Sequence, residues 1–305
     1  MIFTKTFESG LQFAFRRTRS QVAYSALAIQ SGTRNEPEAL SGIAHMTEHM
    51  LFKGTLKRTP QQISNRLEML GGELNAYTAK EETVLYSTVL KEDTAKAVDL
   101  LFELAFTSTF PQKELDKERC VVIDEINMYK DSPSECIFEE FERLLFGPSP
   151  LARSILGTTK SLKKIDSEAL RDYVGQGFRP ENMCIAIVGN LTPQRAEKIA
   201  RQAAAKYIPA DYVPAARPAR PAVPAELPVP PRFERKWPRR TTRSTASSAP
   251  PPILIMTNGG WRWSCWPTCS ADLAPTPGST SSCAIKTPWS MPSTLPSPNL
   301  PTMVP

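Results

Sequence analysis

The only two histidines of this 305-residue chain lie within five consecutive residues, at His45 and His49, with Glu48 between them. On a helix, positions i and i+4 project from one face about one turn apart, so both imidazoles can reach one metal ion. Glu48 lies beside them and can take a proton from a zinc-bound water, as in the inverted zincin pattern HxxEH. The alternative is that two histidines share one helix by composition alone.

A catalytic zinc ion needs a third protein ligand, with the fourth position left for water. Glu118, Asp124 and Glu125 follow Pro111 in a segment with helical character. Glu118 and Glu125 are two helical turns apart and share a face, whereas Asp124 is rotated away from it. One of the pair could ligate while the other holds the ligands in place. The plainer alternative is that these acids form a solvated surface.

Strands and helices alternate through the first two thirds of the chain and must position these residues. The hydrophobic patterns and turn residues predict strands at 2–8, 11–17, 22–29, 74–78, 83–90 and 184–190. Helices are expected at 42–52, 60–70, 93–106, 111–129, 133–146, after Asp166 and at 193–207. We therefore predict an α+β fold with a mixed, largely antiparallel sheet covered by helices.

Composition changes sharply near residue 208. The chain has 29 prolines and five tryptophans, and residues 209–305 contain 21 of these prolines and all five tryptophans. The natural interpretation is one domain over 1–208 and a disordered, Pro/Ser/Trp-rich tail over 209–305. The net charge of +6 arises mostly in this tail, so it is poor evidence for a nucleic-acid partner.

The chain shows no targeting signal of a secreted or membrane protein. Its N-terminus lacks a basic segment followed by an apolar run, and no window approaches about 20 apolar residues. Cys120, Cys136 and Cys184 are scattered singly. We expect a cytoplasmic protein without a membrane partner.

Residues 4–207 resemble the M16 metallopeptidases, the pitrilysin or insulinase-like family that includes the mitochondrial processing peptidase. Five motifs occur in the family's order: SGTRNE at 31–36, GIAHMTEHMLFKGT at 42–55, GGELNAYTAKEETVLY at 71–86, ERCVVIDEI at 118–126 and VGN at 188–190. In the family, the third zinc ligand follows the second histidine by about 76 residues, and this position is Glu125 here.

The resemblance implies one zinc ion per chain, held by His45, His49 and Glu125. It implies Glu48 as general base and Glu118 as a supporting catalytic acid. The expected activity is zinc-dependent hydrolysis of peptide bonds. The alternative is a non-catalytic M16-like subunit or an inert fragment that acts only in protein binding.

The strand at 74–78 resembles the family's edge strand, which holds substrates extended by adding them to the sheet. Asn75 and Ala76 are the positions carried over, and the implied partner is a peptide or unfolded protein. Family members also have a second, similar domain that closes over the zinc and contributes an arginine and a tyrosine.

No second domain is recognisable beyond residue 210 as the sequence is written. Rereading the tail one base out of frame, with permitted codons, turns 260–272 and 273–294 into segments similar to that domain's opening helix and its Arg/Tyr segment. We therefore expect a one-base slip between Ala210 and Lys236; a natural disordered extension is the alternative. Activity should be weak or absent unless a second domain or chain supplies the Arg/Tyr pair.

Overall fold

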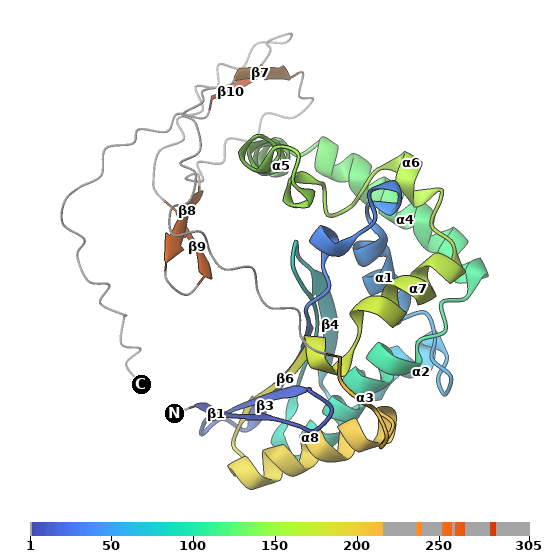
Figure 1. The fold of residues 1–305 in the computed structure, drawn as a ribbon, viewed down its shortest axis with the longest axis vertical. Coiled ribbons are helices and arrows are strands. Elements are labelled where there is room, and N and C mark those ends of the chain that lie inside the picture. The colour runs from blue at the N-terminus through green and yellow to red at the C-terminus, as the bar shows by residue number, and fades with distance from the viewer. Residues whose placement is uncertain (1, 216–235, 240–251, 258–259, 266–280, 285–305) are drawn as a thin grey trace, which may run out of the picture. The chain divides into compact units, whose positions relative to one another are not determined.

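The structure, a computed structural model, describes residues 2–215 together with 236–239, 252–257, 260–265 and 281–284 (Figure 1). The chain divides into two compact units, Met1–Ala222 and Val223–Pro305, and each is considered on its own.

A six-stranded sheet forms the centre of the first unit, in the order β1-β2-β6-β3-β5-β4. Its strands are β1 (Ile2–Thr6), β2 (Gln12–Arg17), β3 (Val22–Ile29), β4 (Glu73–Thr78), β5 (Thr83–Leu90) and β6 (Met183–Gly189). Only β2 and β6 run parallel, and the other neighbours are antiparallel. The predicted mixed, largely antiparallel sheet is confirmed.

Eight α-helices accompany the sheet in the described residues. They are α1 (Ile43–Leu51), α2 (Pro60–Glu68), α3 (Thr94–Thr107), α4 (Gln112–Lys130), α5 (Pro133–Phe146), α6 (Thr159–Leu162), α7 (Ser167–Gly177) and α8 (Pro193–Tyr207). The predicted elements agree with these to within two residues at each end. The one-turn helix α6 was missed because four residues are too few to show a helical period.

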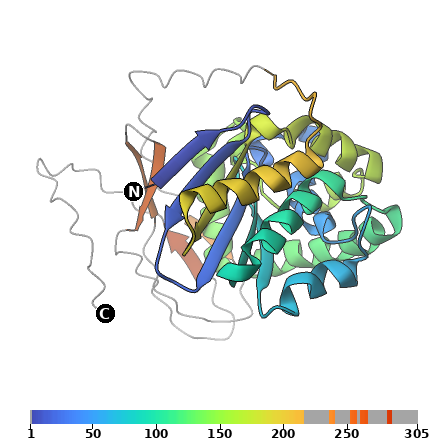
Figure 2. The same ribbon diagram turned by 90° about the horizontal axis from the view of Figure 1, so that it is seen from below.

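The core lies between the sheet and helices α3 and α8, which cross one of its faces (Figure 2). Alternate residues of the central strands point into it, as Leu27 of β3 and Ile185 of β6 do. Helix α3 contributes Leu101 and Leu104, both without exposed surface. The apolar faces of the strands, which repeat every second residue, therefore pack against the apolar stripe of α3 in one core.

Helix α1 lies among α4, α7 and the edge strand β4 (Figure 1). Met46 and Met50 on α1 have no exposed surface, so they anchor the helix in the core. The helix also contacts α4 and β4. Strand β4 lies at the end of the sheet order, and among the described strands it pairs with β5 alone.

In the second unit, β7 (Lys236–Arg239) pairs with β10 (Ser281–Ala284), and β8 (Pro252–Thr257) pairs with β9 (Gly260–Cys265). The remainder of the tail predicted to be disordered, apart from residues 209–215, lies outside the described residues. Among the helices that the structure describes, none combines the length and apolar character needed to span a membrane.

Candidate metal centre

Helix α1 brings His45 and His49 together on one face. The helix begins after Gly42, and its regular turns place the two imidazole ring centroids 4.6 Å apart. His45 is buried with 8% of its surface exposed, and His49 is half-buried. Burial, with a smaller contribution from His49, lowers the pKa of His45 to about 3, so this ring is neutral at physiological pH and has a free lone pair for a metal.

Glu125 completes the group from helix α4. Its Oε2 atom lies 3.7 Å from Nε2 of His45 and 3.7 Å from Nε2 of His49. Ligand atoms on a tetrahedral zinc ion, with bonds of about 2.0–2.1 Å, lie about 3.3 Å apart. The three side chains thus need only small movements to hold a zinc ion, and nitrogen and carboxylate oxygen are donors that zinc accepts.

Glu118 lies two turns before Glu125 on α4 and contacts the other nitrogen of His49. Its Oε1 atom is 2.9 Å from His49 Nδ1, and its Oε2 atom is 2.7 Å from Lys53 Nζ. Burial alone would raise the pKa of Glu118, but the hydrogen bonds from Lys53 and His49 outweigh it and lower the pKa. An ionised Glu118 accepts a hydrogen bond from the Nδ1–H group of His49, which leaves the lone pair of His49 Nε2 free to face Glu125.

Glu48 is held at the same centre by the edge strand. Thr78 Oγ1, at the end of β4, donates a hydrogen bond of 2.5 Å to Glu48 Oε2. Burial raises the pKa of Glu48 and the nearby Glu125 raises it further, while the Thr78 hydrogen bond and His49 oppose the rise. A carboxyl group with a raised pKa is suited to accept and return a proton near neutral pH.

Asn75 and Ala76 lie on β4 with Thr78. The exposed Asn75 is opposite Tyr86 of β5 in the strand register. Its Oδ1 atom accepts a hydrogen bond of 2.8 Å from the Ala76 N–H. The structure thus places these two residues at a sheet edge that leads, through Thr78, to Glu48.

The structure brings together the five residues that the sequence placed in the centre, and it leaves Asp124 exposed on α4, as predicted from the helical period. Two contributors were missed. Lys53 lies four residues after His49, a spacing that could have indicated it. Thr78 gave no signal because its contact with Glu48 spans 30 residues of sequence.

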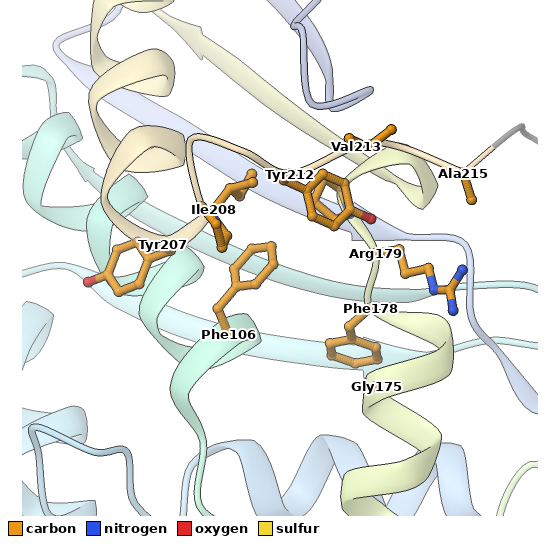
Figure 3. A pocket seen from close by; sticks show the side chains of 11 residues that line it. Phe106, Gly175, Phe178, Arg179, Tyr207, Ile208, Tyr212, Val213 and Ala215 are labelled. Carbon is orange, nitrogen blue, oxygen red and sulfur yellow. The ribbon is translucent and has the colours of Figure 1, made fainter.

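A cavity of about 480 Å³ lies elsewhere in the first unit (Figure 3). Aromatic side chains surround it, among them Phe106, Phe178 and Tyr212, with Arg179 at one side. None of the metal-centre residues lines this cavity. The acid and imidazole groups suited to chemistry therefore lie outside it, between α1, α4 and β4.

Two family sequence models match consecutive parts of the chain. The sequence model described as Insulinase (Peptidase family M16) matches residues 13–159, and that described as Peptidase M16 inactive domain matches 164–249. The second match includes residues on both sides of the interval in which a frame slip is expected, and the slip stays a prediction.

Curated relatives match the first part of the chain. The uncharacterized zinc protease YmxG of Bacillus subtilis is 37% identical over 164 residues, which are 54% of this chain and 40% of that protein. The mitochondrial-processing peptidase subunit beta of Dictyostelium discoideum is 32% identical over 185 residues, 60% of this chain and 39% of that protein. The chain thus spans about two fifths of the length of these relatives.

Solved structures share the fold. A crystal structure of a peptidase M16 inactive domain from Pseudomonas fluorescens aligns with a TM-score of 0.65 at 24% identity, over 72% of this chain and 53% of that one. A protease from Helicobacter pylori aligns with a TM-score of 0.63 at 22% identity, over 66% and 49%. With two M16 sequence models in succession and zinc proteases among its relatives, the chain belongs to the M16 family of peptidases.

Proposed function

We propose that this chain is a zinc-dependent metalloendopeptidase that hydrolyses peptide bonds of extended peptides. The observation that carries the proposal is the convergence of His45 Nε2, His49 Nε2 and Glu125 Oε2, with the two nitrogens each 3.7 Å from the oxygen. Zinc proteases among the relatives support the same class of reaction.

One zinc ion per chain would be held by His45, His49 and Glu125. When bound, zinc polarises the scissile carbonyl and lowers the pKa of a water molecule from about 15.7 towards 7. Glu118 keeps the ring of His49 in the orientation that ligation needs, because its Oε1 atom accepts from Nδ1.

Glu48 is the general base of the proposed reaction. Its carboxylate accepts the proton of the attacking water and then delivers it to the nitrogen of the leaving amine. The raised pKa of Glu48 favours the first of these transfers, since a more basic carboxylate accepts a proton more readily. The Thr78 hydroxyl fixes Oε2, so the other oxygen, Oε1, is left to meet the water.

The substrate is proposed to bind along β4, where an extended peptide would add a strand to the sheet. Asn75 and Ala76 supply the contacts: the Ala76 N–H can donate to a substrate carbonyl once the Asn75 side chain releases it. A peptide strand in this position would run beside Thr78 and reach Glu48. The contact between β4 and α1 supports this placement. The substrate class is an unstructured peptide or an unfolded protein.

A second M16-like domain or chain is proposed to cover the centre and supply an arginine and a tyrosine. The match to the M16 inactive-domain model and the name of one relative, a peptidase subunit beta, support a role for such a partner. We propose no nucleic-acid or membrane partner and a cytoplasmic location. The other candidate is a non-catalytic M16-like subunit, which would bind protein without cleaving it.

The test is a measurement of zinc stoichiometry and of peptide cleavage. Purified protein is dialysed, assayed for bound zinc by atomic emission, and incubated with unstructured fluorogenic peptides beside a Glu48→Gln variant. We expect one zinc per chain in both proteins and cleavage only in the wild type, alone or with an added second M16 domain. A chain without bound zinc, or equal cleavage by Glu48→Gln, contradicts the proposal. Bound zinc without cleavage under any of these conditions favours the non-catalytic subunit.

A further inference from the structure

Helix α1, which carries His45 and His49, has no side-chain cap on its first turn. The residue before the helix is Gly42, which has no side chain to accept hydrogen bonds from the free amides of the first turn. Glu36, six residues earlier, takes this role from outside the helix. Its Oε2 atom accepts from the Gly42 N–H at 3.0 Å, and its Oε1 atom accepts from the Ala44 N–H at 2.8 Å.

Close packing explains why the cap comes from outside. Gly42 has a φ of +93°, and a Cβ atom there would lie 2.7 Å from the Leu156 carbonyl oxygen. Serine, threonine or aspartate, the usual capping residues, therefore cannot replace it. Glu36 is itself held in place, because Arg153 Nη1 donates to its main-chain oxygen at 2.8 Å.

The two histidines differ in what orients their rings. His49 is held by the Glu118 carboxylate at Nδ1. Nδ1 of His45 is buried and has no hydrogen-bond partner among the described residues. The position of His45 therefore depends on its own main chain and on packing, and its main chain directly follows Ala44, one of the two residues that Glu36 holds.

We propose that Glu36 is a positioning residue of the metal centre: by holding the first turn of α1, it places His45 for ligation. This inference rests on the proposed zinc-binding function. Glu36 would thus position His45 as Glu118 positions His49. Glu118 acts on the imidazole ring, whereas Glu36 acts on the main chain next to His45.

Glu36 holds its carboxyl group in a buried environment. The side chain is 5% exposed, and burial raises its pKa to about 7 against the opposing effects of the two amide hydrogen bonds and the charges of Arg153 and Lys80. Its ionised form is therefore less favourable in the folded protein than in water. A glutamine has the same shape but one acceptor oxygen, and its NH₂ group would face one of the two amides. We expect Glu36→Gln to remove the buried charge and to weaken the hydrogen bonds that hold the first turn of α1.

The test compares cobalt binding by Glu36→Gln and wild type. Co²⁺ is titrated into the metal-free protein at pH 8, and its visible absorption reports both the dissociation constant and the tetrahedral geometry. We expect Glu36→Gln to bind about tenfold more weakly, within the range that outer-sphere changes produce in metal sites, without a lower melting temperature of the metal-free protein. A structural role alone would lower the melting temperature and leave the affinity of the folded protein unchanged.

Glu181→Gln is the matched control. Glu181 is also 5% exposed and also accepts a main-chain N–H, that of Ala215 at 3.1 Å, with a hydroxyl hydrogen bond from Tyr212 at 2.6 Å. Neither of these hydrogen bonds involves α1, so its substitution should leave the cobalt dissociation constant unchanged. Equal losses in Glu36→Gln and Glu181→Gln would overturn the proposal.

Two further outcomes keep the inference distinct from the proposed function. Wild type that binds no cobalt contradicts the zinc-binding function itself. Wild type and Glu36→Gln that bind cobalt equally contradict only the role of Glu36. Should Glu36→Gln not fold, Glu36→Asp decides, because it keeps the charge but is one methylene too short to reach both amides. We expect it to bind more weakly than wild type, and wild-type affinity would overturn the proposal.

Discussion

Glu118 contacts His49 on the ring nitrogen that faces away from Glu125: Oε1 of Glu118 is 2.9 Å from Nδ1, whereas Glu125 lies 3.7 Å from Nε2. The imidazole is thus held between two carboxylates of one helix, two turns apart. Lys53 Nζ, 2.7 Å from the other oxygen of Glu118, keeps that carboxylate ionised. The order of contacts is Lys53, Glu118, His49 and then the metal centre.

Removal of the Glu118 carboxylate from this series of contacts should weaken metal binding. We expect Glu118→Gln to raise the zinc dissociation constant about tenfold or more, because the ring of His49 loses its charged acceptor. Competition with a chromophoric chelator measures the constant. Asp124→Asn, an exposed acid of the same helix, is the control and should have no effect. Equal weakening by both variants would mean that the helix's overall charge, and not the contact with His49, governs affinity.

Thr78→Val should raise the pKa of Glu48 further. The Thr78 hydroxyl stabilises the ionised carboxylate, so its removal leaves burial and the charge of Glu125 less opposed. The carboxyl carbon resonance of Glu48, assigned by its absence in Glu48→Gln, can be followed in a pH titration by NMR. Its midpoint should move to higher pH in Thr78→Val. An unchanged midpoint would contradict the importance of the hydrogen bond.

Glu36 should give the metal-free protein a characteristic pH dependence. Its pKa is about 7 when folded and 4.5 ordinarily, so between these values the folded state binds the proton more tightly than the unfolded state. The free energy of unfolding therefore falls as pH rises through this window, by up to about 3 kcal/mol, and is constant above it. Arg153, Lys80 and Tyr173 are the other charged or titratable groups that act on Glu36 or respond to it.

His45 has the opposite effect on the pH dependence of the free energy of unfolding, so a variant that changes only Glu36 is needed. Its pKa is lowered to about 3, so the unfolded state binds more protons below its ordinary pKa of 6.5, and stability rises with pH there. Glu36→Gln keeps the His45 contribution and removes that of Glu36. Urea unfolding is measured at pH 5 and pH 8 with chelator present. The free energy of unfolding of the variant, relative to that of wild type, should be higher at pH 8 than at pH 5. Parallel pH profiles would contradict the shifted pKa of Glu36.

A proline at the free sheet edge should weaken substrate binding. Ala76→Pro removes the main-chain N–H that now donates to Asn75. We expect about fivefold weaker binding of a fluorescent unstructured peptide to the Glu48→Gln background, the effect of one hydrogen bond of about 1 kcal/mol. Ala76→Gly, which keeps the N–H, is the control for loss of the methyl group. Unchanged anisotropy titrations in Ala76→Pro would place the peptide elsewhere.

The tail carries a prediction about the gene. A one-base slip between the codons of Ala210 and Lys236 would explain why prolines and tryptophans gather beyond it. Resequencing should find one base gained or lost in this interval, and restoring it should yield a recognisable second M16 domain. A confirmed reading frame without such a base would establish the tail as a natural extension.

Local sequence determined most elements of the first unit. Pro60, Pro133 and Pro193 each begin a helix, because proline is favoured in the first turn, where its missing N–H has no intrahelical partner to lose. The apolar character of residues 22–29 likewise predicted a buried strand, and β3 has the same bounds. The His45–His49 spacing and the seven-residue spacing of Glu118 and Glu125 are also local, since one helical period decides which residues share a face.

Only the tertiary structure decided which of these faces meet. The order of the sheet, with β6 inserted between β2 and β3, joins segments more than 150 residues apart, and no local pattern encodes such a pairing. The contact of Thr78 with Glu48 spans 30 residues and that of Glu36 with Ala44 spans eight, but neither follows from a helical or strand period. They depend on the distance between elements that pack in three dimensions. The sequence by itself thus determined the proposed metal ligands and the helix face that carries Glu118, and packing decided the contacts of Thr78 and Glu36.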